Sequence, residues 1–304
     1  PQRILAELGP DETLPLFWHV EGQAGANLYL LGSIHVGPRA GWEYPEAVEQ
    51  AFDNAHALVV EFNPEEISES GLERMIRRYG QLPRGRSLRN ELSPETWDLV
   101  KTRLQNSTLG IAAASRMRPW LLSELLILEE IGRSGYIAEG GVEAAFVARA
   151  GRRSIVSLES AHMQVAGLAS LPLATQELAL LDVLKQQERN QNHLQEMIDA
   201  WRVGDEKSLE RYVFRTLAQD QAFTPFFQTM IFQRNHRMRA QLEVLLNAEH
   251  HAGENVFVTI GIAHLIGDRG ICAALEARGY RVKRIDRDAL RIEGGEEHSL
   301  AVHP

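Results

Sequence analysis

The chain has 304 residues, 44% of them hydrophobic, so it can bury a substantial core and is neither disordered nor collagen-like. Its formal net charge of −9 argues against nucleic acid as a default partner, because no basic stripe is present to displace counterions from phosphates. The single cysteine, Cys272, excludes an intrachain disulfide, and its place in an apolar helical run favours a buried structural thiol over a nucleophile.

The N-terminal part of the chain predicts a hairpin, a helix and a third strand. The apolar runs 15–22 and 27–35 flank the turn-rich segment GQAGAN, which is typical of two strands joined as a hairpin. A helix is expected from about Pro45 to Asn54, with proline in its first turn. The run ALVVEFN, residues 57–63, predicts the next strand.

Most of the middle of the chain is predicted to be helical, in the segments 64–139 and 166–254. Ser93 is expected to cap one of these helices, and Asp205 to cap another that restarts after Gly204. Between the two segments, GVEAAFVARA predicts a helix, and RSIVSLES predicts a strand after it.

The C-terminal part repeats the order of elements seen near the N-terminus. The run NVFVTIGIAH predicts a strand, a helix follows from about Gly270 to Arg278 and stops at Gly279, and YRVKRID predicts the last strand. We therefore expect an α/β protein in which two pseudo-repeated halves make a central mixed β-sheet, with helical insertions covering the site.

This organisation predicts one domain over residues 1–287 and a polar tail over 288–304. Its sheet-forming parts are about 17–63 and 140–165 plus 255–287. No apolar run reaches the length that crosses a bilayer. Because the sequence starts at Pro1, we expect that an N-terminal segment, such as an export signal, has been removed.

A strand followed by Gly-x-x-His occurs twice, and this duplication is the most informative pattern in the sequence. The first copy pairs Gly32 with His35, and the second pairs Gly261 with His264. Glycine at a strand end allows a sharp turn or a close approach, so each histidine is expected at the same rim of the sheet. Two imidazoles presented there could bind a metal ion, move a proton, or do both.

Two glutamates also follow predicted strands. Glu61 comes after ALVV and Glu159 after IVSL, and ligands bind at the carboxyl ends of strands in open α/β sheets. Either acid could instead cap the next helix or pair with an arginine. His35, His264 and Glu61 together would make a two-histidine, one-carboxylate set suited to a divalent transition metal.

The ordered combination of motifs resembles the TraB/GumN family, which is related to the Tiki metalloproteases. The segments that carry the resemblance are LYLLGSIHV, VVEFNP, LPRGRSLRNELSPETW, GVEAAFVARA, SLES with Gln164, AWRVGD, QRNHRM and VFVTIGIAHLIGDRGICAALEARGYRV. The family's paired Gly-x-x-His motifs match Gly32 with His35 and Gly261 with His264, and its acid after the third strand matches Glu61.

The resemblance implies further site residues. The family's arginine and asparagine on a late helix match Arg234 and Asn235, which could otherwise lie on a solvated helix face. Arg234 would orient Glu61 or Glu159 or stabilise an oxyanion, and Asn235 could belong to the same network. Many relatives carry Gly-Val-Asp where this chain has Glu143 after Gly and Val, so a catalytic role for Glu143 is in doubt.

The leading hypothesis is a metal-dependent, peptidase-like hydrolase acting on a peptide or a small amide or ester. His35, His264 and Glu61 would bind manganese or cobalt, with zinc as a further possibility, and Glu61 could instead act as general base on an activated water. The resemblance makes the bacterial periplasm or the outside of the cell the favoured location. Two alternatives are a haem-, metal- or peptide-binding protein without turnover, and a structural duplication with hydrogen-bonded histidines.

Overall fold

The structure is a computed structural model that describes residues 14–186 and 193–286. Its strands are β1 (Phe17–Val20), β2 (Asn27–Ser33), β3 (Gly37–Pro38), β4 (Ala57–Val60), β5 (Tyr136–Ile137), β6 (Ser154–Ser157), β7 (Asn255–Gly261) and β8 (Val282–Arg284). Its α-helices are α1 (Glu46–Asp53), α2 (Glu69–Met75), α3 (Leu88–Glu91), α4 (Pro94–Leu104), α5 (Ile111–Ala114), α6 (Pro119–Arg133), α7 (Val142–Arg149), α8 (Ala161–Ser170), α9 (Leu173–Gln186), α10 (His193–Arg202), α11 (Glu206–Val213), α12 (Arg215–Gln219), α13 (Thr224–Phe227), α14 (Gln233–Asn247), α15 (Ile262–Leu265) and α16 (Ile271–Glu276). Short 3-10 turns are η1 (Pro64–Glu66), η3 (Ala138–Gly140), η4 (Gln221–Phe223) and η6 (Glu249–His251), and the π-helical turns are η2 (Ile76–Gly80) and η5 (Gln228–Phe232).

A six-stranded mixed sheet, in the order β6-β4-β7-β2-β1-β8, forms the centre of the fold. Strands β6, β4, β7 and β2 are parallel to one another, whereas β1 runs antiparallel to both β2 and β8. The central strands β2 and β7 are buried over nearly their whole length, which explains why both are continuous apolar runs. The predicted α/β class with a mixed sheet is confirmed.

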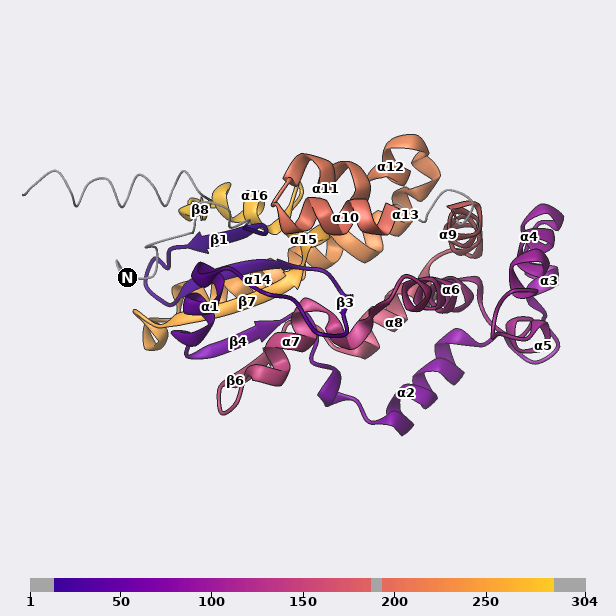
Figure 1. Ribbon diagram of the computed structural model, residues 1–304, viewed down its shortest axis with the longest axis horizontal. Helices are drawn as coiled ribbons and strands as arrows, with labels where there is room; N and C mark the ends of the chain where they lie inside the picture. Colours follow the sequence, from indigo (N-terminus) through magenta and orange to yellow (C-terminus); the bar gives the residue numbers. More distant parts are fainter. Residues whose placement is uncertain (1–13, 187–192, 287–304) are drawn as a thin grey trace, which may run out of the picture.

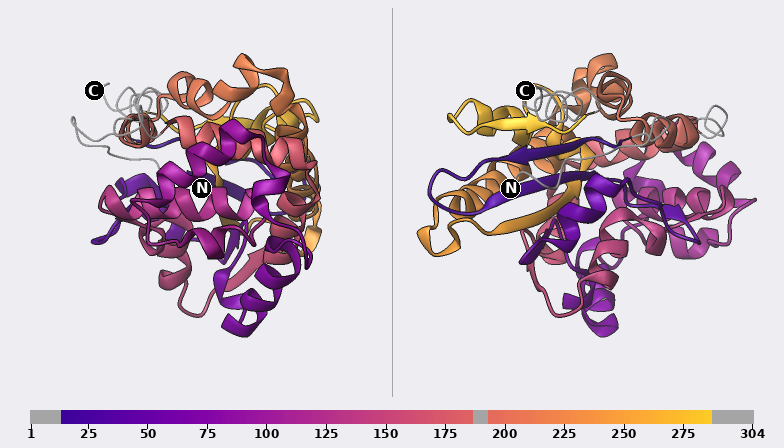
Figure 2. Two further views of the ribbon diagram at one scale, coloured as in Figure 1. Left: turned by 90° about the vertical axis from the view of Figure 1, so that its right-hand side faces the viewer. Right: turned by 60° about the vertical axis from the view of Figure 1, so that its left-hand side comes forward.

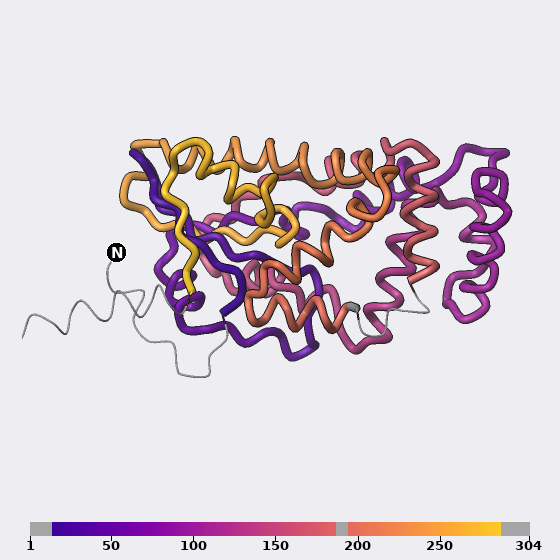
Figure 3. The backbone as a smooth tube through the Cα atoms, turned by 90° about the horizontal axis from the view of Figure 1, so that it is seen from above, coloured from indigo at the N-terminus to yellow at the C-terminus, as the bar shows by residue number. Residues whose placement is uncertain are grey.

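Helices cover both faces of this sheet, as Figures 1 and 3 show with α1 on one side and α14 on the other. On the α1 side the rings of Phe52 from α1, Phe146 from α7 and Phe257 from β7 contact one another, with centroids 4.7 to 5.4 Å apart. All three are essentially buried, so this aromatic group fixes α1 and α7 against the middle of the sheet.

The helices from α2 to α6, with α8 and α9, extend beyond the carboxyl ends of the parallel strands (Figures 1 and 2). They enclose a second buried apolar cluster, drawn mainly from α3, α4, α6 and α9 and separate from the core of the sheet. Its members are Leu82, Leu88, Leu92, Trp97, Val100, Leu104, Ala114, Leu122, Leu126, Leu180 and Leu184. The carboxyl edge of the sheet therefore faces a helical layer that has its own hydrophobic support.

Several predicted helix boundaries are confirmed. Ser93 accepts a hydrogen bond from the backbone of Thr96 at the start of α4, and Asp205 caps α11 through the backbone of Ser208. The described residues include no single helix with the length and apolar character of a bilayer span; α8 and α9 reach both only as a pair, bent by 100°.

Other predictions need correction. The strand predicted over 57–63 ends at Val60, because the backbone N–H of Glu61 donates to Glu143 Oε1 instead of extending the sheet. The segment 64–139 is not entirely helical, since β5 pairs with β3 in a small second sheet. The order strand, helix, strand does repeat, but β4 lies beside β7 while β8 lies at the far edge beside β1. The tail predicted over 288–304 falls outside the described residues.

Candidate functional site

His35, His264 and Glu61 meet at the carboxyl edge of the sheet, around Gly261. A Cβ atom built on Gly261 would lie 3.1 Å from Glu61 Oε2, 3.4 Å from His35 Nε2 and 3.5 Å from His264 Cδ2. The absence of a side chain at Gly261 thus leaves a small space that is lined by both motif histidines and the glutamate. We call this space the Gly261 cradle.

The two Gly-x-x-His motifs reach this cradle by different local structures. In the parallel pairing of β2 with β7, Gly261 lies opposite Ser33, so the two motif glycines are one residue out of register. After Gly261 the chain turns into α15 and buries His264, whereas after Ser33 it bends and leaves the His35 side chain 66% exposed. The duplicated sequence therefore gives one buried imidazole and one that is open to solvent.

Arg234 joins the acids that follow β4 and β6. Its Nη2 donates to Glu61 Oε1, its Nε donates to Glu159 Oε2 at 2.6 Å, and its Nη1 donates to the carbonyl of Met230 at 3.0 Å. Arg237 donates to the other oxygen of Glu159 at 3.0 Å. Glu159 is thus a buried partner of two arginines, and its backbone N–H donates to the carbonyl of Glu61 at 2.9 Å.

The charge state of Glu61 follows from these neighbours. Burial raises the pKa of Glu61, but His264, Arg234, His35 and the backbone N–H of Gly261, 3.2 Å from Oε2, together lower it to about 2. Arg234 is the permanent charge among them, so Glu61 is an anion at neutral pH.

Asn235 fixes the orientation and the tautomer of His264. Its Nδ2 donates to the carbonyl of Arg269 at 2.8 Å, so its Oδ1 faces His264 Nδ1 at 2.6 Å and accepts a hydrogen from it. Burial lowers the pKa of His264 to about 4, with Arg234 and His35 adding to that effect and Glu61 opposing it. At neutral pH the free lone pair of His264 Nε2 therefore faces Glu61 Oε2 at 3.7 Å.

Glu143 lies against the same cradle, from the first turn of α7. Its Oε1 accepts the backbone N–H of Glu61 at 3.0 Å, and its Oε2 lies 3.8 Å from His35 Nδ1. Burial raises the pKa of Glu143 well above its ordinary value, the charge of Glu61 raises it further, and the Glu61 hydrogen bond and Arg234 oppose this. The longer side chain at this position thus contacts both Glu61 and His35.

Comparison with known proteins assigns the chain to a family. The sequence pattern of the TraB/PrgY/gumN family matches residues 16–284, which include every residue named above. The chain belongs to the TraB/PrgY/gumN family. The family assignment expected from the ordered motifs is confirmed.

The individual relatives share only a low sequence identity with this chain. The uncharacterized protein YbaP of Escherichia coli K12 is 24% identical over 245 residues, covering 80% of this chain and 85% of YbaP. The protein named metalloprotease TIKI1 of Danio rerio is 24% identical over 302 residues, covering 84% of this chain and 60% of its own length. No solved structure matches the chain.

Three contacts at the site could not be predicted from the sequence. Gln164, in the first half of α8, donates to Glu61 Oε1 at 3.0 Å. The indole of buried Trp201 donates to the carbonyl of Gly32 at 2.7 Å and so fixes the end of β2. Arg237 holds Glu159. All three residues lie in segments that resemble the family, namely SLES with Gln164, AWRVGD and QRNHRM. Their position in these motifs is therefore the feature of the sequence that could have indicated their role.

The donors at the Gly261 cradle fit a divalent cation in their chemistry. His264 Nε2 and Glu61 Oε2 are both electron-pair donors 3.7 Å apart, and two ligands about 2.1 Å from one ion can lie up to about 4.2 Å apart. The buried hydroxyl of Ser33, on the same face as Gly261, has no hydrogen-bond partner among the described residues. In residues 14–186 and 193–286, however, no three or more His, Cys, Asp and Glu side chains form a complete ligand set, so the third ligand would have to close in.

Proposed function

We propose that the protein is a metal-dependent hydrolase that cleaves a peptide or a related amide or ester bond. The observation that carries the proposal is the pair of unprotonated donors, His264 Nε2 and Glu61 Oε2, that face each other across 3.7 Å. Two such atoms repel unless a cation or a proton lies between them, and the lowered pKa of His264 disfavours a proton on it at pH 7. Membership in a family with a distant relative named a metalloprotease adds independent support.

His264, Glu61 and His35 would hold the ion, with manganese or cobalt preferred and zinc as a further candidate. His35 is the ligand that would complete the set, because its Nε2 already lines the cradle, 3.4 Å from the position of a Cβ atom on Gly261. A bound divalent ion would polarise the scissile carbonyl group and lower the pKa of a nearby water.

The other residues position these ligands. Asn235 keeps His264 in the tautomer with Nε2 free, and such outer contacts are typically worth a factor of 10 to 100 in metal affinity. Arg234 keeps Glu61 ionised, and a carboxylate with a pKa of about 2 is better suited to bind a cation than to accept a proton. Of the two roles predicted for Glu61, the structure thus favours that of ligand.

The test is metal binding to the metal-free full chain, measured by calorimetry with manganese, cobalt and zinc. Wild type should bind one ion per chain, and His264→Ala and His35→Ala should each weaken binding at least tenfold. His162→Ala is the matched control, because His162 is exposed and bonds Tyr79 rather than the cradle. Equal affinity of wild type and His264→Ala, or no binding of any of the three ions, would sink the proposal.

Peptide cleavage is then assayed with the ion that binds. Wild type should cut a peptide mixture, and both histidine variants should lose turnover. Each variant should still unfold cooperatively on heating, which shows that it is folded. Cleavage that persists in a chelator, or in either variant, would contradict a role for the ion in turnover.

A second candidate is a protein that binds haem, a metal ion or a peptide at this site without turnover. It is favoured by the incomplete ligand set in the described residues and by the hydrogen bonds that both oxygens of Glu61 already make. Haem titration tests the haem-binding form of this candidate, since a haem protein develops strong visible absorption that His264→Ala should remove. Binding of a metal ion without any peptide cleavage would favour its metal-binding form over the hydrolase.

The proposed partners and location go with the leading candidate. The substrate is proposed to be a peptide or a small amide or ester, and nucleic acid is not expected for a chain of net charge −9. The bacterial periplasm or the outside of the cell is proposed as the location. Fractionation of cells that express the full-length tagged protein tests this, and recovery in the cytoplasm alone would contradict it.

A further inference from the structure

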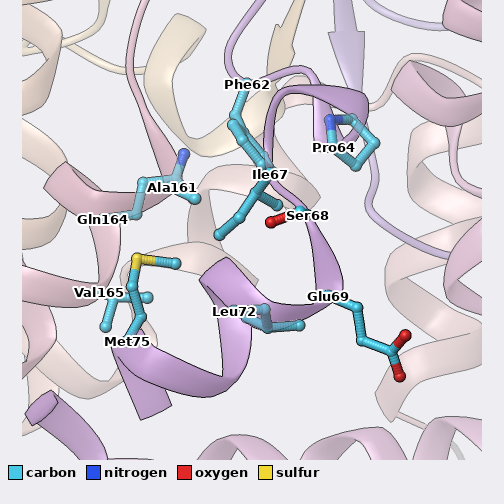
Figure 4. A pocket seen from close by; sticks show the side chains of 10 residues that line it. All are labelled: Phe62, Pro64, Ile67, Ser68, Glu69, Leu72, Met75, Ala161, Gln164 and Val165. Carbon is cyan, nitrogen blue, oxygen red and sulfur yellow. The ribbon is translucent and has the colours of Figure 1, made fainter. Parts of the chain in front are cut away.

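An apolar cavity of about 400 Å³ lies beside the candidate site, between η1 and α2 on one side and α8 on the other. Its lining residues are Phe62, Pro64, Ile67, Ser68, Glu69, Leu72, Met75, Ala161, Gln164 and Val165. Figure 4 shows the side chains of Ile67, Leu72, Met75 and Val165 around one space, with the carboxylate of Glu69 pointing away from it. We call this cavity the α2–α8 pocket.

Two lining residues of the α2–α8 pocket adjoin Glu61 of the Gly261 cradle. Phe62 directly follows Glu61 in the chain and lines the pocket. Gln164 lines it from α8 and also donates to Glu61 Oε1 at 3.0 Å. A ligand in the pocket would therefore lie one side chain away from the carboxylate that is proposed to bind the ion.

Two polar groups of the pocket are already engaged and the Glu69 carboxylate points away from it, so its chemistry is mainly apolar. Ser68 Oγ accepts the backbone N–H of Gly71 as the cap of α2, and the amide of Gln164 is held by Glu61. The remaining walls are aliphatic, aromatic or thioether surface. A charged ligand would lose its hydration there without gaining a partner, whereas an apolar one would gain by leaving water.

One wall of the pocket is firmly held and the other is not. The loop before η1 is fixed by Asn63, whose N–H donates to Ser157 Oγ at 3.1 Å and whose side chain accepts from Glu65 N. In α2, by contrast, no residue is buried, and Leu72 of the pocket wall is 44% exposed. An apolar side chain left half in water at a concave surface is a feature of ligand pockets.

We propose that the α2–α8 pocket binds a bulky apolar side chain of a peptide, next to the bond at the Gly261 cradle. The binding step stands on the pocket alone, and the identification of that peptide as a substrate rests on the hydrolase function proposed above. A leucine- or phenylalanine-sized side chain is the expected occupant, and an acidic one is disfavoured because the lining residues include no cation.

Binding is tested without any turnover, by NMR of the full chain labelled with ¹³C at the methionine methyl groups. The Met75 methyl should shift saturably with N-acetyl-leucine amide and N-acetyl-phenylalanine amide, and not with N-acetyl-aspartate amide. The methyl of Met238, which is fully buried and does not line the pocket, should stay fixed. No Met75 shift with any amide, or an equal shift with the aspartate amide, would overturn the proposal.

Two variants locate the binding. Val165→Trp fills the pocket and Leu72→Glu places a charge in its wall, so each should weaken both apolar amides at least tenfold. Val244→Trp is the matched control, since Val244 is 65% exposed on α14 and outside the pocket. Unchanged affinity in both pocket variants would contradict the assignment. A Met75 shift that follows protein concentration instead of the amide would mean that a second copy occupies the pocket, which also contradicts it.

Cleavage of a peptide mixture, analysed by mass spectrometry, separates this inference from the proposed function. Enrichment of large apolar residues at one fixed distance from the cut, shifted toward alanine by Val165→Trp, supports both. A Met75 shift without any cleavage supports the pocket and overturns the hydrolase. Cleavage with no apolar preference and no Met75 shift supports the hydrolase and overturns the pocket.

Discussion

Arg234 carries the charge balance of the site, because it is the permanent cation between two buried carboxylates. Glu61 and Glu159 are each at most 4% exposed in their side chains and both accept from this guanidinium. Removing one partner of a buried ion pair leaves the other charge in a low-dielectric interior without compensation. Loss of the Arg234 side chain should therefore destabilise the folded chain strongly.

We expect Arg234→Ala to lower the free energy of unfolding by about 3 to 5 kcal/mol in metal-free protein at pH 7. Arg237→Ala is the matched control, because Arg237 contacts the same Glu159 but its side chain is 41% exposed. The control should cost less than about 1 kcal/mol. Urea denaturation measures both values, and equal losses in the two variants would show that burial of the charges is not the cause.

The raised pKa of Glu143 should make the folded chain less stable as the pH rises, whereas the lowered pKa of Glu61 has the opposite effect. A pKa raised in the folded state contributes stability that is complete below the ordinary value of 4.5 and is lost as the pH rises through the folded value. Glutamine at this position cannot ionise. Glu143→Gln should therefore gain stability over wild type as the pH rises from 4.5, with little difference below it.

The measurement is urea denaturation of metal-free protein at a series of pH values, with Glu139→Gln as control. Glu139 is exposed in the short turn before α7, so its replacement should leave the curve of wild type unchanged. A difference between Glu143→Gln and wild type that shrinks as the pH rises would refute the assignment.

At the scale of elements, the sequence predicts which side chains meet but not how they meet. His35, His264 and Glu61 each follow an apolar strand, and the common edge of parallel strands explains their approach. The one-residue offset between the motif glycines depends on the register of β2 and β7, which the two similar motifs do not reveal. The role of Gln164 likewise could not be predicted, because its contact with Glu61 depends on where α8 packs. The two residues are 103 positions apart in the chain.

The same offset makes the two motif glycines unequal, which a pair of substitutions tests. In Gly261→Ala the new methyl would lie in the cradle, 3.1 Å from Glu61 Oε2, so metal binding should fall at least tenfold. In Gly32→Ala the new methyl would lie 2.3 Å from Ile262 Cδ1, so it would disturb the packing of the core and not the cradle. We expect a loss of stability of about 1 to 3 kcal/mol for Gly32→Ala, with the metal affinity changed less than in Gly261→Ala.

Calorimetry with the ion and urea denaturation without it give the two values for each variant. The comparison fails if Gly261→Ala binds the ion as wild type does, or if Gly32→Ala loses more affinity than Gly261→Ala.

At the scale of the whole molecule, the sheet is set by local patterns, whereas the helical layer is set by long-range contacts. Continuous apolar runs at 28–33 and 256–261 predict buried central strands whatever lies elsewhere. The cluster around Leu88 and Leu122 joins helices that the sequence shows only as separate amphipathic stretches. Which of these helices face the site could therefore not be predicted from periodicity alone.

Within that layer the segment 64–79 is fixed at its ends and unburied between them. Ser157 Oγ holds the chain at Glu66, and the carbonyls of Tyr79 and Gly80 accept from Trp120 and Arg118. No residue from 64 to 79 is buried. Segments with little buried surface open locally at low free energy, so this one should be the readiest part of the described layer to open.

Limited trypsin digestion of native protein tests this expectation. Cleavage after the exposed Arg74, Arg77 and Arg78 should precede cleavage after the buried Arg103 and Arg239 by at least about tenfold in rate, because the latter need deeper unfolding. Since these first sites lie in and next to the wall of the α2–α8 pocket, N-acetyl-leucine amide should slow their cleavage in wild type. In Val165→Trp the amide should give no such protection, and earlier cutting at Arg103 would show that the helical layer opens as a unit.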